Sequence, residues 1–142
     1  MGAYFPDTRN IVIYLQGINM IVNNKDCTCN YEQLIILVIL HEIGHFWYHK
    51  MVKGENYSPD TIVQEWVAQM FTFLIIKENQ EVKDCMTNLS KKQPIEYKTY
   101  CDSFFEKGVK EFRAKLKDVK SLKNDINMII EAQKYNITDS NC

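Results

Sequence analysis

Two stretches of the chain carry apolar side chains at helical spacing. The first, residues 31–51, contains no helix breaker except Gly44, and its first half is apolar nearly all round. That pattern is typical of a buried helix. The second stretch, residues 61–77, keeps a broad apolar face made of Val63, Trp66, Val67, Met70, Phe71 and Leu74. This spacing predicts a second helix packed on a core.

A polar loop over residues 54–59 separates the two predicted helices. Its end has the composition of a helix start. Ser58 is expected to be the N-cap, with Pro59 as the first helical residue and Asp60 favourably placed in the first turn.

The N-terminal part has a different pattern. Residues 11–15 are short, β-branched and aromatic, and they follow a cluster of Pro, Asp and Asn, which predicts a strand. Residues 18–22 are a candidate second strand. The polar, turn-rich residues 23–30 are expected to form a loop.

Beyond the second helix, residues 84–94 are expected to form another loop. Ser103 and Glu106 match a capping box, which predicts a helix with Phe105, Val109, Phe112, Leu116 and Val119 on one side. A last helix is expected over residues 122–134. The fold class is therefore predicted to be α+β, with a small antiparallel or mixed sheet followed by helices, in a single domain covering residues 1–142.

Composition and charge exclude several classes of protein. The chain has 142 residues and a formal net charge of −1, so it has no overall positive charge that would attract nucleic acid. Residues 107–123 include seven basic and two acidic residues. We interpret them as a solvated helix face and not as a nucleic-acid patch, because no aromatic or Gly-rich element for nucleic-acid recognition accompanies them. The longest apolar run, residues 34–40, is too short to span a membrane, and no targeting segment is evident. These features predict a cytoplasmic protein.

The five cysteines are scattered, odd in number and without a CxxC pair. We therefore expect no disulfide framework. Cys27-Thr-Cys29 is a weak indication of metal or redox chemistry, since a soft-metal site usually needs a second pair of ligands.

The chemical signal is the HExxH motif His41-Glu42-Ile43-Gly44-His45 inside the first helix. Histidines at i and i+4 lie one turn apart on one face, so both imidazoles can bind one zinc ion. Glu42 is rotated off that line and can take a proton from a metal-activated water. Two histidines and a glutamate in an apolar helix would otherwise be costly to bury.

A catalytic zinc needs a third protein ligand. His49 is excluded, because it lies about 12 Å along the helix axis from His41. Glu55, Asp60 and Glu65 remain. Glu65 is preferred, since it lies deeper in an amphipathic helix, and a carboxylate among apolar neighbours favours a cation nearby. We expect the ligand atoms of His41, His45 and Glu65 to lie roughly 3–4 Å apart, and each histidine to offer its second ring nitrogen to a carbonyl or carboxylate.

The chain resembles the ImmA/IrrE-type metallopeptidases, a branch of the Glu-ligand zincins. The resemblance covers roughly the first 80 residues and rests on Gly2–Pro6 with Asn10–Ile13, on Leu37–His45, and on Glu65–Phe71. Gln69 stands where that family usually has Asn, and a DNA-binding helix-turn-helix is missing. The resemblance implies a cytoplasmic, often regulatory zinc peptidase that cleaves a repressor protein.

The sequence thus predicts a metallopeptidase with one zinc per chain and a protein or peptide substrate. Two alternatives stay open: a regulator that binds zinc and peptide without cleaving, and a helical interaction protein with an accidental HExxH. Phe46, Trp47 and Tyr48 are expected to pack in the core. Eight tyrosines are available as oxyanion donors, and spacing does not choose among them.

Overall fold

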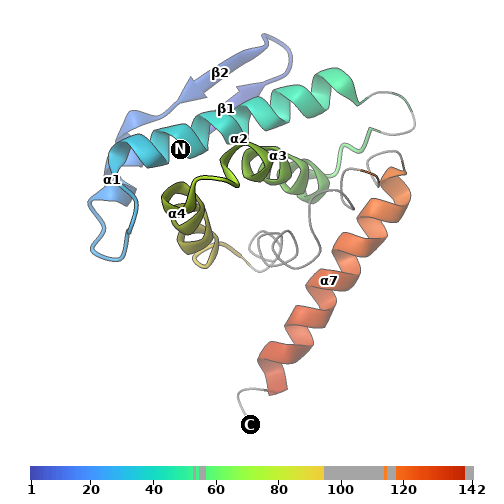
Figure 1. The fold of residues 1–142 in the computed structure, drawn as a ribbon. Helices are drawn as coiled ribbons and strands as arrows, with labels where there is room; N and C mark the ends of the chain where they lie inside the picture. The colour runs from blue at the N-terminus through green and yellow to red at the C-terminus, as the bar shows by residue number, and fades with distance from the viewer. Residues whose placement is uncertain (53, 55–56, 95–113, 115–117, 140–142) are drawn as a thin grey trace.

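The long helix α2 (Tyr31–Met51) contacts most of the other described helices and strands. The computed structural model describes residues 1–52, 54, 57–94, 114 and 118–139 (Figure 1). Over these residues the chain is mostly helical, with one small antiparallel sheet, an arrangement compatible with the α+β class. The described elements are β1 (Gly2–Phe5), β2 (Asn10–Ile13), α1 (Leu15–Val22), α2 (Tyr31–Met51), α3 (Thr61–Ile76), α4 (Gln80–Ser90) and α7 (Val119–Asp139).

The strands β1 and β2 form an antiparallel hairpin that packs along α2. Their register pairs Gly2 with Ile13 and Phe5 with Asn10. The strand predicted over residues 11–15 therefore exists, but it lies over residues 10–13 and pairs with β1, which was not predicted as a separate strand. Figure 1 shows the hairpin on one side of α2 and α3 on another.

The strand predicted over residues 18–22 is wrong, because these residues belong to helix α1. A strand would place Ile18 and Met20 on the same face. Instead Ile18 is fully buried and Met20 is 77% exposed. Ile18, Ile21 and Val22 all pack on the core, and their spacing of three and four residues is helical.

Helix α2 begins at Tyr31 and ends at Met51, as predicted. A capping box starts it: the Asn30 side chain accepts a hydrogen bond from the Gln33 amide at 2.9 Å, and the Gln33 side chain accepts one from the Asn30 amide at 3.0 Å. Two of the unpaired amides of the first turn are thus satisfied. Tyr48 lies in the core, as predicted, whereas Trp47 packs against it partly buried.

Helix α3 begins two residues later than Ser58 would place it. Its N-cap is Asp60, whose carboxylate accepts a hydrogen bond from the Ile62 amide at 3.0 Å. Ser58 is held instead by the core, since its amide donates to the Tyr48 hydroxyl at 2.9 Å. This buried contact fixes the chain before the helix, so Pro59 lies outside it.

Helices α2 and α3 approach closely where Gly44 faces Ala68. A Cβ atom added to Gly44 would lie 2.8 Å from the Ala68 Cα and 2.9 Å from its carbonyl oxygen. Both are backbone atoms, which cannot rotate away. A glycine is therefore needed at this point for the two helices to pack as they do.

The substitution Gly44→Ala should destabilise the protein by about 2 kcal/mol. Alanine gains about 1 kcal/mol of helix propensity, but overpacking against backbone costs about 3 kcal/mol, at the upper end of the usual range. Urea unfolding measures the difference. Gly17→Ala in α1 is the matched control, because its Cβ would meet nothing closer than 3.8 Å, and it should be neutral or stabilising. Equal stabilities for the Gly44 variant and the parent would contradict the close packing.

The loop predicted over residues 84–94 is wrong for residues 84–90, which belong to helix α4, whereas residues 91–94 are non-helical as predicted. Asn79 caps it by accepting a hydrogen bond from the Val82 amide at 3.1 Å. Val82, Cys85 and Met86 are buried at helical spacing. This amphipathic pattern outweighs the polar composition of the segment.

The expectation of no disulfide is wrong for one pair of cysteines. Cys29 and Cys85 form a disulfide, with their Cα atoms 5.2 Å apart. The two residues are 56 positions apart, and packing of α4 against α2 brings them together. Sequence spacing alone does not reveal such a pair.

Helix α7 covers the predicted 122–134 segment and is longer at both ends. Its buried residues Leu122, Ile126 and Ile130 follow one face, and the helix contacts α3. The helix predicted to start at Ser103 and most of the basic segment 107–123 lie outside the described residues. Within the described part of the chain, no helix has the length and apolar content needed to cross a membrane.

Candidate metal centre

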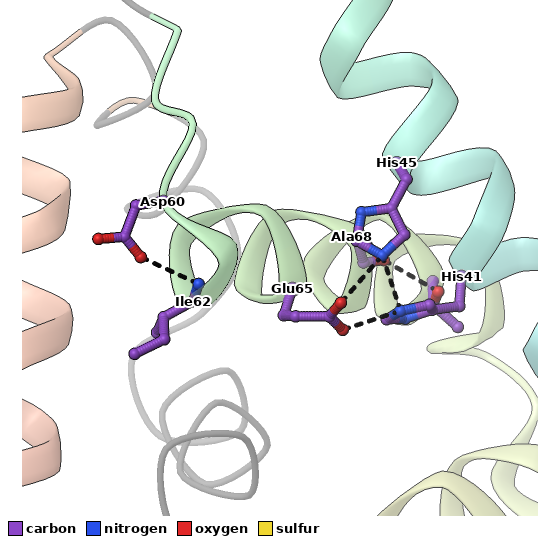
Figure 2. Close-up of polar contacts among 7 residues, drawn as sticks. His41, His45, Asp60, Ile62, Glu65 and Ala68 are labelled. Atoms are coloured by element: carbon purple, nitrogen blue, oxygen red, sulfur yellow. Dashed lines mark hydrogen bonds and ion pairs between the residues drawn. The ribbon is translucent and has the colours of Figure 1, made fainter. Parts of the chain in front are cut away.

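Three side chains from two helices converge on one point. His41 Nε2 lies 3.0 Å from Glu65 Oε2, and His45 Nε2 lies 3.3 Å from Glu65 Oε1. The two histidine Nε2 atoms are 3.0 Å apart. Figure 2 shows both imidazoles reaching down from α2 toward the Glu65 carboxylate on α3. The convergence expected from the sequence is therefore present.

The packing of the two helices produces this geometry. His41 and His45 are one turn apart on α2, and their rings meet edge to face with centroids 4.7 Å apart. Glu65 lies in the second turn of α3. The close contact between Gly44 and Ala68 lies beside it and sets the separation of the helices.

The donor set fits a zinc ion. Two imidazole nitrogens and one carboxylate oxygen are a known three-ligand set for catalytic zinc. In a tetrahedron, bonds of about 2.1 Å place neighbouring ligand atoms about 3.4 Å apart. The distance of 3.0 Å between the two Nε2 atoms and that of 3.0 Å from His41 Nε2 to Glu65 Oε2 lie close to this value. His45 Nε2 lies 3.3 Å from the other carboxylate oxygen, Oε1. Among the described residues, His41, His45 and Glu65 form the group of potential metal ligands whose ligand atoms all lie within 4.8 Å of one another.

The charge of Glu65 also suits a metal ligand. Burial raises its pKa, but hydrogen bonds with His41 and His45, and the charge of the two histidines, lower it more, so the pKa falls to about 2. Glu65 is therefore a carboxylate at neutral pH, and an anionic oxygen is a stronger zinc ligand than a protonated one.

The second nitrogen of His41 departs from expectation. Its Nδ1 is buried, and no described residue hydrogen-bonds with it. The predicted carbonyl or carboxylate partner is thus wrong for His41. Because Nδ1 faces the protein interior, Nε2 is the nitrogen that His41 presents to the site.

Glu42 directly follows His41 in α2 and is 6% exposed. Strand β1 covers it: a Cβ atom on Gly2 would lie 2.8 Å from Glu42 Oε1 and 2.7 Å from Val38. The absence of a side chain at Gly2 allows the strand to approach the carboxylate this closely.

A cavity of about 510 Å³ contains the site. Its walls come from the N-terminal segment and β1, from α2, from α3 and from α4. Glu42 and all three converging residues line it. A buried carboxylate and a candidate metal centre therefore open into the same space, which is large enough for part of a peptide.

Tyr4, His49 and Tyr57 are among the other residues that line this cavity. The Tyr4 hydroxyl hydrogen-bonds with His49 Nδ1 at 3.2 Å, and the His49 ring packs edge to face on Tyr57, with centroids 6.2 Å apart. His49 does not join the converging triad, as its distance along α2 predicted. The sequence could not select Tyr4 and Tyr57 among eight tyrosines, because both reach the cavity through tertiary contacts.

Asp60 and Glu55 are the two acidic residues that were not preferred as the third zinc ligand. Asp60 caps α3 and forms an ion pair with Lys123 of α7 at 2.6 Å, away from the histidines (Figure 2). The Lys123 contact and the Ile62 amide outweigh burial and hold the pKa of Asp60 below its usual value. Glu55 lies outside the described residues.

The comparisons with known proteins identify no relative, so the assignment of the site rests on its geometry. No protein-family model, no curated protein and no solved structure matches the chain.

Proposed function

We propose that the protein is a zinc-dependent metallopeptidase that hydrolyses peptide bonds. His41, His45 and Glu65 would hold the zinc, and Glu42 would act as general base. The observation that carries the proposal is the meeting of two Nε2 atoms and an ionised carboxylate, at 3.0–3.3 Å, beside a buried glutamate in one cavity. The spacing of the HExxH motif supports it as well.

The roles follow from what each residue presents to the cavity. When bound, zinc polarises the scissile carbonyl and makes water more acidic. Glu42 accepts a proton from the attacking water and can then deliver it to the leaving amine. Its burial under Gly2 limits the exposure of the carboxylate to bulk water. Tyr4, His49 and Tyr57 supply the hydrogen-bond donors near the site that could stabilise negative charge on the carbonyl oxygen.

We further propose a zincin-type active-site helix in α2 and a glutamate-bearing helix in α3. The resemblance to ImmA/IrrE-type peptidases extends the proposal to a regulatory protease that acts on a repressor-type protein. A cytoplasmic location is part of the same proposal.

The alternatives predict different geometry. A helical interaction protein with an accidental HExxH gives no reason for Glu65 to face both histidines, yet its two oxygens contact one each. A regulator that binds zinc without cleaving is favoured by a cleft without oxyanion donors, and this cavity holds two tyrosines and a third histidine. The peptidase is therefore preferred.

Zinc content tests the proposal first. The purified protein should contain, or take up, about one zinc per chain, and chelation should lower its melting temperature. Zinc at a hundred times its Kd would stabilise the folded state by about 2.7 kcal/mol. Elemental analysis and thermal unfolding measure both quantities. Failure to take up zinc from an excess would reject the metallopeptidase.

A further inference from the structure

Three cysteines lie where the loop before α2 meets α4. Cys29 precedes the N-cap of α2, and its disulfide to Cys85 ties that loop to α4. Cys27 is two residues away, and its thiol donates a weak hydrogen bond to the Cys29 carbonyl oxygen at 3.7 Å. Among the described residues, Cys27 is the free cysteine.

The disulfide is accompanied by two weaker contacts at the same junction. The Asn88 side chain donates to Thr28 Oγ1 at 2.9 Å, and the Lys92 ammonium donates to the Asp26 carbonyl oxygen at 3.2 Å. Both contacts are exposed, and such contacts contribute little to stability. The covalent bond is therefore the strongest of these three contacts, and it adds to the core packing of Val82 and Met86.

Attachment of α4 matters for the candidate site, because α4 forms one wall of its cavity. Met86, Leu89 and Ser90 of α4 line the cavity together with His41 and Glu65. Loosening α4 would open this wall.

The three cysteine residues differ in exposure. Cys29 is 5% exposed and Cys85 is 2% exposed, so an external thiol has almost no access to their disulfide. Cys27 is only partly buried. Thiol–disulfide exchange needs direct attack of a thiolate on a disulfide sulfur. Cys27, whose thiol contacts the Cys29 carbonyl oxygen, is the free thiol of the described residues and lies two positions from that disulfide.

We propose that Cys27, Cys29 and Cys85 form a thiol–disulfide exchange site that responds to dithiol reductants and controls the attachment of α4. In the first step the Cys27 thiolate attacks Cys29 Sγ. A Cys27–Cys29 bond forms, the Cys29–Cys85 bond breaks, and Cys85 leaves as a thiolate that takes up the proton lost by Cys27. The step consumes no oxidant or reductant.

In the second step an external dithiol reduces the Cys27–Cys29 bond. The dithiol loses two electrons and two protons and leaves as a disulfide, and both cysteines end as thiols. Disulfides in the cytoplasm are rare and are mostly transient, catalytic or sensing, so this chemistry also agrees with the proposed location. The inference does not depend on zinc or on peptidase activity.

Reduction kinetics test the proposal. The folded full-length protein is treated with dithiothreitol, quenched by alkylation at successive times and mapped by mass spectrometry, which reads each cysteine separately. We expect an intermediate with Cys85 alkylated and Cys27 linked to Cys29. Cys27→Ser should slow the release of Cys85 at least tenfold. Thr28→Ser, which keeps the neighbouring hydroxyl and the thiol, should react like the parent.

Amide hydrogen exchange tests the effect on α4. After reduction, amides of residues 80–90 should exchange at least tenfold faster, while those of the middle of α2 keep their protection. Release of Cys85 at the parent rate in Cys27→Ser, with no Cys27–Cys29 intermediate in the parent, would overturn the relay. Unchanged exchange of α4 after complete reduction would overturn its control of the attachment, and this measurement on the parent protein requires no variant to fold.

Discussion

Replacing Glu42 by glutamine should leave zinc binding unchanged and reduce peptide hydrolysis by about 10³-fold. The amide has nearly the shape of the carboxylate, but it cannot accept a proton from water, and a positioned general base contributes about 10²–10⁴-fold to rate. Glu42 lies beside the triad without belonging to it. Its loss should therefore affect the reaction and not the metal.

The measurement is cleavage of a mixed peptide library by the zinc-loaded protein, followed by mass spectrometry. Glu32→Gln is the matched control, because Glu32 lies exposed in the first turn of the same helix and should keep full activity. Full activity of Glu42→Gln would show that Glu42 is not the base. A parent protein that binds zinc and cleaves nothing would favour the non-catalytic regulator.

Glu65→Ala should lower zinc affinity by about 100-fold or more. Glu65 supplies the anionic donor of the three, and even partners that only support a ligand are worth 10–100-fold in metal affinity. Its low pKa means that this ligand is ionised at neutral pH. Isothermal titration with a competing chelator measures the affinity.

Glu78→Ala is the control for this substitution. Glu78 follows the end of α3, is exposed, and lies outside the triad, so its removal should leave zinc affinity unchanged. Circular dichroism verifies that both variants fold. If Glu65→Ala keeps the parent affinity while His41→Ala loses it, the third ligand is another group, and the assignment of Glu65 is wrong.

The local sequence pattern was sufficient to predict the helices and strands whose structure is determined within a single segment. The 31–51 helix was predicted with its observed bounds, because apolar side chains at helical spacing and the absence of breakers act within the segment. The two histidines follow from the same periodicity. The strand predicted over residues 18–22 was wrong, since a short apolar run fits a strand or a helix equally well, and only its packing against α2 decides.

The remaining features depended on contacts between distant segments. Helix α4 looked like a loop by composition, and the disulfide of Cys29 was invisible in the spacing of the cysteines. Asp60 was predicted to lie in the first turn of the helix. In the structure the Ser58 amide donates to the Tyr48 hydroxyl in the core, and the Asp60 side chain caps the helix instead.

By itself, the sequence determined that two imidazoles share one face of a long helix with a glutamate between them, because a helix fixes neighbours three and four residues apart. The sequence also limited the candidates for the third zinc ligand to Glu55, Asp60 and Glu65. Tertiary structure decided which of them meets the histidines, because the close approach of Gly44 and Ala68 brings the second turn of α3 opposite them. It also decided which tyrosines reach the cavity and which cysteines pair, since such distances depend on how the helices pack.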